Sequence, residues 1–281
     1  MWSHGYRDWA SSLWAADMKI ITWNVNSVHA RLPRLIALLA RHQPDLICLQ
    51  EIKTTADLFP AREVAAAGYQ AVVHGQAGRN GVAVLARSPV TDAVRGFPGD
   101  PAPEQARVLS VSVNGLRVVS TYVVNGKETG APEYELKLRW LDAFADWMRG
   151  SHQPGDPLIV AGDFNVTPDD RDVYDPDAWR GRNLCSEPER RRVHGLLDWG
   201  LTDLARAHSP GPGPYTFWDY RAGAFHRGWG LRIDLALAAA PVAARCTAVT
   251  VDRDERKPTF GEGKPSDHAP LVVSLGSRPS R

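Results

Sequence analysis

Short β-rich runs recur along almost the whole chain, whereas only three stretches carry a helical pattern. The strand-like runs lie at 19–25, 45–50, 69–74, 81–86, 107–113, 116–124, 158–161, 231–238, 244–251 and 270–274. Helical spacing of apolar residues appears at 31–41, 133–148 and 188–199. Because a sheet must bury its apolar face against another layer, this pattern predicts an α/β architecture with two packed sheets.

No Pro/Gly/Ser linker and no internal repeat divides the 281 residues into self-sufficient halves. We therefore expect a single domain over 18–276 and a short tail over 277–281. Residues 1–17 are expected to form a loosely ordered extension. Met18 directly precedes the first strand-like run, and we expect it to be the natural start of the protein.

Composition excludes several classes of protein. Lys and Arg total 33 against 32 Asp and Glu, a net charge of +1, which excludes a polybasic nucleic-acid binder. No apolar stretch is long enough to span a bilayer, and the N-terminus lacks the apolar centre of a secretory signal. The three cysteines are far apart and lack the spacing of a zinc site. We expect a cytoplasmic protein with no membrane partner.

Polar residues recur at the ends of the predicted strands, where a rigid scaffold can direct them into one cleft. The six segments are 23–26, 49–51, 121–126, 162–165, 232–234 and 266–270. Each segment alone also fits a turn, a strand exit or a surface ion pair. The local pattern therefore leaves both the functional and the structural interpretation open.

Taken together and in order, these segments resemble the exonuclease III family of abasic-site endonucleases and 3′-5′ exodeoxyribonucleases, within the endonuclease/exonuclease/phosphatase superfamily. The resemblance runs from Met18 to about Leu275 through TWNVNS, LQEIK, GVAVL, TYVVNG, EYELKLRWLDAF, GDFNV, DVYDPDAW, YTFWDYRAGAF, GLRIDLAL and SDHAPLVV. It implies a four-layer α-β-β-α sandwich, in which two central, largely antiparallel sheets are flanked by helices. It also implies a DNA-repair hydrolase that removes nucleotides from 3′ ends and cuts 5′ to abasic sites, by metal-assisted attack of water on phosphate.

The residue types also favour a hard metal ion. Carboxylate and amide oxygens without a Cys/His cluster suit Mg²⁺, which keeps several waters and takes few protein ligands. We expect one or two ions, for which Mn²⁺ can substitute, with Glu51 as the main ligand. The full candidate metal set is Asn24, Glu51, Asp163, Asn165, Asp267 and His268.

The resemblance assigns catalytic roles to five residues. Asp163 orients or deprotonates the attacking water, and Asn165 holds that water or a phosphate oxygen. His268 donates to the scissile phosphate, and Asp234 binds the other side of the imidazole, which favours the imidazolium. Tyr122 donates to a phosphate oxygen or to the leaving group. The identity of the literal general base stays open.

DNA recognition is expected to involve a pocket and a set of surface contacts. Phe217, Trp218 and Leu231 match the positions where the family lines a pocket for a flipped, base-less sugar. For the two aromatic residues, a place in the core is the alternative. The candidate DNA-backbone contacts, each with a plain surface role as its alternative, are Lys53, Arg79, Asn80, Asn125, Lys127, Arg221 and Arg227.

Two departures from the family pattern bear on the loops. Val124 stands where the family often has proline, which leaves the loop after Tyr122 less constrained. Gly228-Trp229 replaces polar residues, which puts DNA contact there in doubt.

The expected partner is double-stranded DNA with abasic sites or 3′ ends, bound by a monomer. One alternative is a superfamily phosphoesterase acting on an inositol or lipid phosphate, and another is a catalytically silent DNA-binding module.

Overall fold

Two six-stranded sheets form the centre of the computed structural model, which describes residues 17–277. The strands of the first sheet, in spatial order, are β11 (Cys246–Val251), β12 (Leu271–Leu275), β1 (Met18–Asn24), β2 (Leu46–Gln50), β4 (Val82–Ala86) and β3 (Gln70–His74). Those of the second are β5 (Val90–Arg95), β6 (Val108–Val113), β7 (Leu116–Tyr122), β8 (Leu158–Asp163), β10 (Asp234–Ala239) and β9 (Leu201–Asp203). Only β1/β2 and β7/β8 pair in parallel, so both sheets are largely antiparallel.

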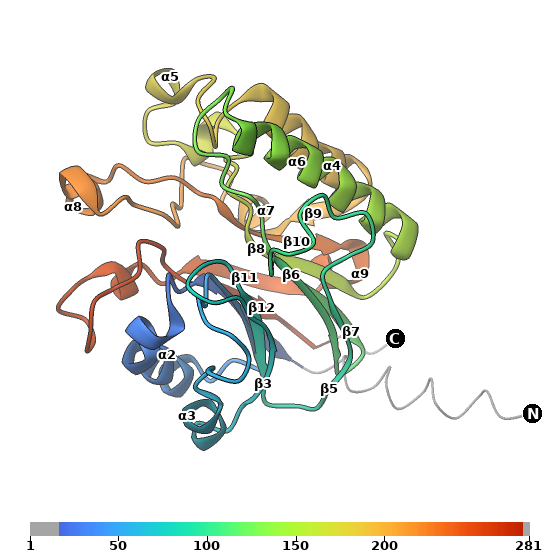
Figure 1. Cartoon of the computed structure of the whole chain (residues 1–281), viewed down its shortest axis with the longest axis vertical. Coiled ribbons are helices and arrows are strands. Elements are labelled where there is room, and N and C mark those ends of the chain that lie inside the picture. The colour runs from blue at the N-terminus through green and yellow to red at the C-terminus, as the bar shows by residue number, and fades with distance from the viewer. Residues whose placement is uncertain (1–16, 278–281) are drawn as a thin grey trace, which may run out of the picture.

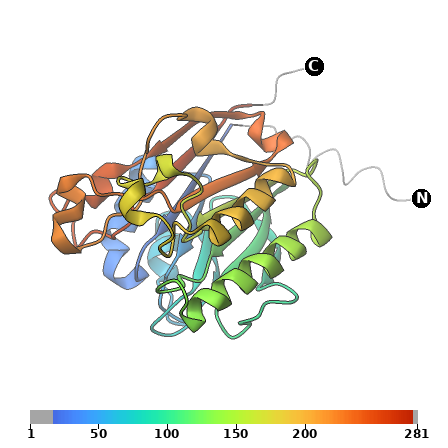
Figure 2. The same cartoon turned by 90° about the horizontal axis from the view of Figure 1, so that it is seen from above.

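Helices cover the outer face of each sheet (Figure 1). The first sheet carries α2 (Val28–His42) and α3 (Ala61–Ala66), and the second carries α4 (Pro132–Ser151) and α6 (Glu187–Asp198). Short helices occupy the connections, namely α5 (Pro176–Trp179), α7 (Leu204–His208), α8 (Ala224–Arg227) and α9 (Ala240–Ala243). Three 3-10 turns complete the set, η1 (Asp170–Asp172), η2 (Arg221–Gly223) and η3 (Arg253–Arg256). The view from above in Figure 2 shows α4 and α6 side by side on this face.

The four layers follow from the side-chain alternation of the central strands. In β1, Ile20 joins the core between the two sheets, whereas Ile21 and Trp23 pack on the helical side with Leu35. Because both faces of β1 are covered, its apolar residues alternate between the two layers, and the strand ends at the polar Asn24. The predicted four-layer sandwich is confirmed.

The sequence signals for turns and helices are mostly confirmed. The strand-like runs at 107–113 and 116–124 form β6 and β7, and Asn114 and Gly115 between them both have positive φ, which is typical of a two-residue hairpin turn. The expected helix at 31–41 begins three residues earlier, after the cap Ser27. Pro33 therefore lies inside α2 and not in its first turn.

Several elements differ from expectation. The strand expected from Leu231 begins only at Asp234, because Leu231 instead makes isolated bridges with Phe217 and Val173. Strand β5 was not expected, since it is an edge strand with mostly exposed residues and little apolar patterning. Cys48 and Cys185 are buried, and burial raises their thiol pKa values to about 12 and about 11.

Some expectations fall on other parts of the chain. The expected extension up to residue 16 and the expected tail from residue 278 lie outside the described residues, and the expected start at Met18 stays a prediction. Among the described helices, none is long and apolar enough to cross a membrane.

Candidate active site

The ends of six strands meet at one edge of the sandwich. In the first sheet, parallel β1 and β2 end at Asn24 and Gln50, beside the start of antiparallel β12. In the second, β7 and β8 end at Tyr122 and Asp163, and Asp163 pairs with Asp234, the first residue of β10. The topology therefore brings together the polar residues that the sequence placed at strand ends.

Gly162 allows this convergence on the side of the second sheet. A Cβ added to Gly162 would lie 1.9 Å from the backbone oxygen of Thr121 on the neighbouring strand. Only glycine permits so close an approach of β7 to β8 at this point. This explains the glycine that precedes Asp163.

Asn24 joins two of the site's carboxylates. Its fully buried side-chain nitrogen donates to Glu51 Oε1 and to Asp163 Oδ2, both at 2.9 Å. Its side-chain oxygen accepts from the backbone nitrogen of Asn26 at 3.0 Å. Asn24 therefore presents its nitrogen to the acids and orients them, whereas the metal set expected an oxygen ligand.

Lys53 balances the charge of Glu51. Its ammonium lies 2.8 Å from Glu51 Oε2 and donates to Asn26 Oδ1 at 2.5 Å. Burial favours the protonated form of Glu51, but Lys53 and the hydrogen bond from Asn24 outweigh it and lower the pKa of the carboxyl group. Lys53 thus binds inside the carboxylate network, and its expected contact with the DNA backbone stays a prediction.

Asp267 lies on the far side of the same network. Its Oδ1 accepts from Asn26 Nδ2 at 3.0 Å, which links it through Asn26 to Lys53 and Glu51. The strand start beside it is fixed by Ser266, whose hydroxyl donates to the backbone oxygen of Asn24 at 2.7 Å. Asn26, noted only as part of a strand end, proves to be the link between the two acids.

His268 bridges two buried aspartates. Its Nδ1 lies 2.8 Å from Asp234 Oδ2, and its Nε2 lies 3.8 Å from Asp163 Oδ2. Burial opposes the charged imidazole, but Asp234 and Asp163 outweigh burial and raise the pKa of His268 to about 10. His268 is therefore an imidazolium at neutral pH, with Asp234 fixing its orientation.

At Asp163, the effect of burial on the pKa outweighs the effect of the neighbouring positive charge. Burial raises its pKa to about 7, with a further rise from Asp234 and an opposing effect from the charge of His268. Its Oδ1 accepts from the backbone nitrogen of Asn165 at 2.9 Å. A carboxylate whose pKa lies near the working pH suits proton transfer.

Tyr122 is held as a hydrogen-bond donor. It is 8% exposed, and burial together with the charges of Glu51 and Asp163 raises the pKa of its hydroxyl well above the usual value. Arg107 lies over the ring at 4.8 Å from its centroid and donates to the backbone oxygen of Tyr122 at 3.1 Å. The phenol therefore stays protonated next to the two acids.

A buried lysine that the sequence analysis missed supports Asn125 and Asn165 from below. Asn125 Nδ2 donates to Asn165 Oδ1 at 3.0 Å. The ammonium of Lys137 donates to the backbone oxygens of Asn125, at 3.1 Å, and Asn165, at 2.5 Å. It also forms an ion pair with Glu189, and both side chains are fully buried. One cation thus ties together the loops after β7 and β8.

These side chains open into a cavity of about 500 Å³. It is lined by Glu51, Asn125, Leu184, Asp163, Asn165, Phe217, Asp219, Tyr220, Arg221, Ile233, Asp267 and His268. Phe217 lies beside His268, with ring centroids 4.9 Å apart. Leu184 and Ile233 complete the apolar wall of the cavity beside Phe217. The sequence analysis did not single out these two residues.

Two pocket residues expected from the sequence lie elsewhere. Trp218 is 2% exposed and packs against Phe225 and Ala269, so it belongs to the core beside the cavity. Leu231 is 1% exposed and packs with Val173. Neither lines the cavity, because Trp218 faces away from its neighbour Phe217 and Leu231 bridges two loops.

The remaining DNA-contact candidates divide by exposure. Arg79, Lys127, Arg221 and Arg227 are exposed, although Lys127 pairs with Glu133 and Arg221 with Asp219. Asn80 is 8% exposed and donates to Gln76 at 2.8 Å. Of these candidates, Arg221 borders the cavity.

The carboxylates on the cavity side of the site fit a hard cation. Asp163, Asp234 and His268 present ligand atoms within 4.8 Å of one another. His268 as an imidazolium has no free lone pair, however, so it cannot bind a metal ion. It is itself the cation that the two aspartates hold. Glu51 and Asp267 supply carboxylate oxygens to the open cavity, and the Lys53 ammonium on Glu51 shows that this edge attracts positive charge.

Comparisons with known proteins agree with this geometry. Residues 21–268 match the Endonuclease/Exonuclease/phosphatase family. Exodeoxyribonuclease III of Haemophilus influenzae is 33% identical over 266 residues, which cover 90% of this chain and 98% of the relative.

Two solved structures share the fold. The 3′ phosphatase NExo from Neisseria, bound to a product DNA hairpin, is similar with a TM-score of 0.88 and 40% identity, over 92% of this chain and 99% of that one. An AP endonuclease from Archaeoglobus fulgidus is similar with a TM-score of 0.86 and 36% identity, over 92% and 99% of the two chains.

Proposed function

Because this chain belongs to the endonuclease/exonuclease/phosphatase family, we propose that it is a Mg²⁺-dependent DNA-repair nuclease. The chain is a hydrolase of the nuclease type, and the resemblance to exonuclease III is confirmed. We propose that it trims 3′ ends and cuts 5′ to abasic sites. The observation that supports this most directly is the pairing of a base, Asp163, with an imidazolium, His268, at the wall of one cavity.

The chemistry assigned to the protein is proton transfer and charge stabilisation. Asp163 accepts a proton from the attacking water, because burial holds its pKa at about 7 and Asn24 and Asn165 fix its two oxygens. Asn165 lies beside it and, with Asn125, orients the water or a phosphate oxygen. Water attacks the phosphorus atom and gives one proton to Asp163, the P–O bond to the leaving oxygen breaks, and the leaving oxygen takes up a proton from solvent water to become a hydroxyl.

Two donors face the charge that develops on the phosphate. His268 stays protonated because its pKa is raised to about 10, so its Nε2 donates to a non-bridging phosphate oxygen. Tyr122 keeps its proton and donates to a phosphate oxygen or to the leaving oxygen. Glu51 and Asp267 would hold Mg²⁺, which supplies Lewis-acid stabilisation of the phosphate and of the leaving oxygen when bound.

The cavity supports selection of a base-less sugar. Phe217, Leu184 and Ile233 form an apolar wall next to the catalytic acids, and the cavity of about 500 Å³ is large enough for a deoxyribose without its base. Rotating a nucleotide out of the duplex costs least where no base has to be unstacked. The Archaeoglobus relative is an AP endonuclease and the Neisseria relative a 3′ phosphatase, and we propose that one site serves both kinds of end.

A labelled duplex with one abasic site tests the proposal. With Mg²⁺ we expect a single incision product, and a blunt undamaged duplex should give a descending ladder from its 3′ end. EDTA should stop both reactions, and Asp163→Asn should lower kcat by roughly 10²–10⁴-fold while DNA still binds.

The same assay separates the alternatives. Release of phosphate from a soluble inositol phosphate, with no DNA product, would indicate a phosphoesterase with a different substrate and not a nuclease. DNA binding with no product under any metal would indicate a silent module. Size-exclusion chromatography of the protein with and without DNA tests the proposed monomer.

A further inference from the structure

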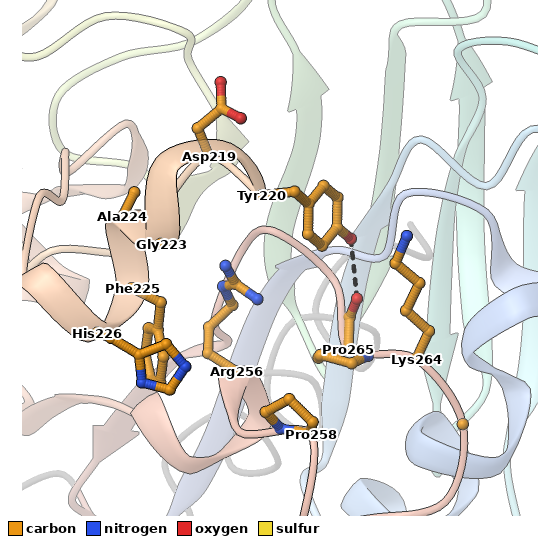
Figure 3. Close-up of a pocket in the computed structure, with 11 residues that line it drawn as sticks. Asp219, Tyr220, Gly223, Ala224, Phe225, His226, Arg256, Pro258, Lys264 and Pro265 are labelled. Carbon is orange, nitrogen blue, oxygen red and sulfur yellow. Dashed lines mark hydrogen bonds between the residues drawn. The ribbon is translucent and has the colours of Figure 1, made fainter.

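A second cavity of about 330 Å³ adjoins the active site on the other side of Tyr220. Asp219 and Tyr220 border both cavities. The second cavity lies between the α8 segment and the loop over 258–265, as Figure 3 shows. The catalytic chemistry described above uses none of its other side chains.

Two cations line this cavity, Arg256 and Lys264, and two more, Arg31 and Arg253, bond to the lining residues Tyr220 and Phe225. Among the described residues, Arg31, Arg253, Arg256 and Lys264 form no ion pair. Arg31 is 6% exposed and bonds only to neutral oxygens, those of Asn26, Tyr220 and Pro265. Such a cluster of unneutralised charge is unusual, because a buried charge without a partner is costly.

Arg256 is the strongest member of this group. It is 5% exposed, and its guanidinium lies between the rings of Tyr220 and Phe225, at 5.3 and 5.1 Å from their centroids. Its Nη2 donates to the backbone oxygen of Trp218, whereas the buried Nε has no hydrogen-bond partner in the described part of the chain. Figure 3 shows this guanidinium directed into the cavity beside Tyr220. The two rings therefore hold the guanidinium charge in place beside the cavity.

The nearby acids are already used. Asp219 accepts from Arg221 through both of its side-chain oxygens. Glu255 pairs with Arg34 and Arg41 on the other side of the loop. Of the described residues that line the cavity, Asp219 is the one carboxylate, and it is paired with Arg221. Arg256 and Lys264 therefore leave the lining with a net positive charge, which Asp267 offsets only from outside the lining.

We propose that this second cavity binds one backbone phosphate of the DNA strand that carries the reacting phosphate. Arg256 and Lys264 contact the phosphate oxygens, and Tyr220 separates the bound phosphate from the catalytic cavity. Lys264 is suited to this role because its ammonium lies 4.6 Å from the Tyr220 ring centroid and is exposed at the mouth of the cavity. The inference rests on the proposed function, since it supplies a second contact to the same substrate.

Lys264→Met and a matched control, Lys257→Met, test the inference. Lys257 lies in the same loop region but is outside the cavity and pairs with Asp254 at 2.6 Å. Both variants lose one positive charge, so long-range attraction to DNA falls equally. Binding of a labelled abasic duplex is measured in EDTA, where no cleavage occurs, over a range of salt concentrations. Arg256→Gln serves as a second variant, with its folding checked by thermal unfolding.

The expected result is a weaker Kd for Lys264→Met, by about tenfold relative to Lys257→Met. The slope of log Kd against log salt should also fall by roughly 0.7–0.9, the value of one lost phosphate contact. A duplex series with one neutral methylphosphonate linkage at each position should contain one position that abolishes the difference between the two variants. Inorganic phosphate at the same concentration as the DNA phosphates should not compete.

Equal Kd values and salt slopes for the two variants would overturn the inference while leaving the nuclease proposal intact. Competition by inorganic phosphate would also overturn it, in favour of a site for free phosphate. If the wild-type protein fails to bind or cut DNA, the proposed function fails first and the inference falls with it.

Discussion

Replacing Lys137 with methionine should destabilise the fold and slow catalysis together. The side chain of Lys137 is fully buried, and its ammonium contacts Asn125, Asn165, Asn183 and Glu189. The substitution Lys137→Met removes all of these contacts. Methionine keeps most of the packing but leaves the Glu189 carboxylate buried without a cation. Removing one partner of a buried pair costs about 3–5 kcal/mol, which is a large part of the stability of an ordinary domain.

The magnitude depends on what Glu189 retains. Its carboxylate still accepts from the backbone nitrogens of Leu184, at 3.1 Å, and Ser186, at 3.0 Å. These bonds keep the loop in place but do not cancel the charge, so the loss should lie in this range and not far above it. Glu189→Gln removes that charge, and the double variant should therefore be more stable than Lys137→Met alone.

Urea unfolding followed by fluorescence measures these free energies, and steady-state cleavage of an abasic duplex measures the kinetics. A shift of the Asn125 and Asn165 loops by about 1 Å should lower kcat by about 10²-fold, with a smaller change in KM. Lys127→Met breaks an exposed pair with Glu133 and should cost less than about 1 kcal/mol, which makes it the control for stability. The reasoning is refuted if Lys137→Met unfolds within about 1 kcal/mol of the wild type, or if the double variant is the less stable one.

Three further predictions concern the site itself. The pKa of His268 is raised to about 10 because the two aspartates outweigh burial, so the rate that needs the imidazolium should be lost only as pH rises towards 10. Asp234→Asn should move this loss to lower pH, which a pH–rate profile of cleavage detects; an unchanged alkaline limb would contradict the role of Asp234. Glu51→Gln should raise the Mg²⁺ concentration for half-maximal cleavage by about tenfold or more, as a metal titration shows, whereas an unchanged requirement would exclude Glu51 as a ligand. Trp218→Ala should cost about 3–5 kcal/mol in urea unfolding, whereas Phe217→Ala should mainly raise KM for the abasic duplex; the reverse pattern would place Trp218 at the substrate.

The strand ends show how much of the site is local information. Asn24, Glu51, Asp163 and His268 each follow or precede a β-rich run, so their place at a sheet edge could be predicted from the sequence. Which edge they share is set by the parallel pairs β1/β2 and β7/β8, and no local pattern specifies these pairings. The order of the segments along the chain and the family resemblance predicted that these residues share one edge.

Lys137 shows why other parts were missed. A lysine in a helix usually extends to solvent, and its ion pair with Glu189 joins residues 52 positions apart. A signal was nevertheless present, because Lys137 lies at helical spacing with the buried Tyr134, Leu141 and Phe144. A charged residue among the apolar residues of one helix face indicates a buried partner of opposite charge.

The aromatic pair at 217–218 was misjudged for a related reason. Neighbouring side chains in an extended segment point to opposite sides, so Phe217 and Trp218 could not both face one cavity. The local geometry was therefore sufficient to exclude one of them. The choice between them required the packing of Trp218 against Phe225.

The two ends of the domain are locked together at the active site. Strand β12 lies between β11 and β1, the Trp23 indole donates to the backbone oxygen of His268, and Ser266 donates to Asn24. A ribosome adds His268 after Glu51 and Asp163, and a domain folds as its chain emerges. An unfinished or truncated chain therefore has the acids but lacks the imidazolium and leaves an edge of β1 open. The proposed active site is therefore complete only when β12 has paired with β1.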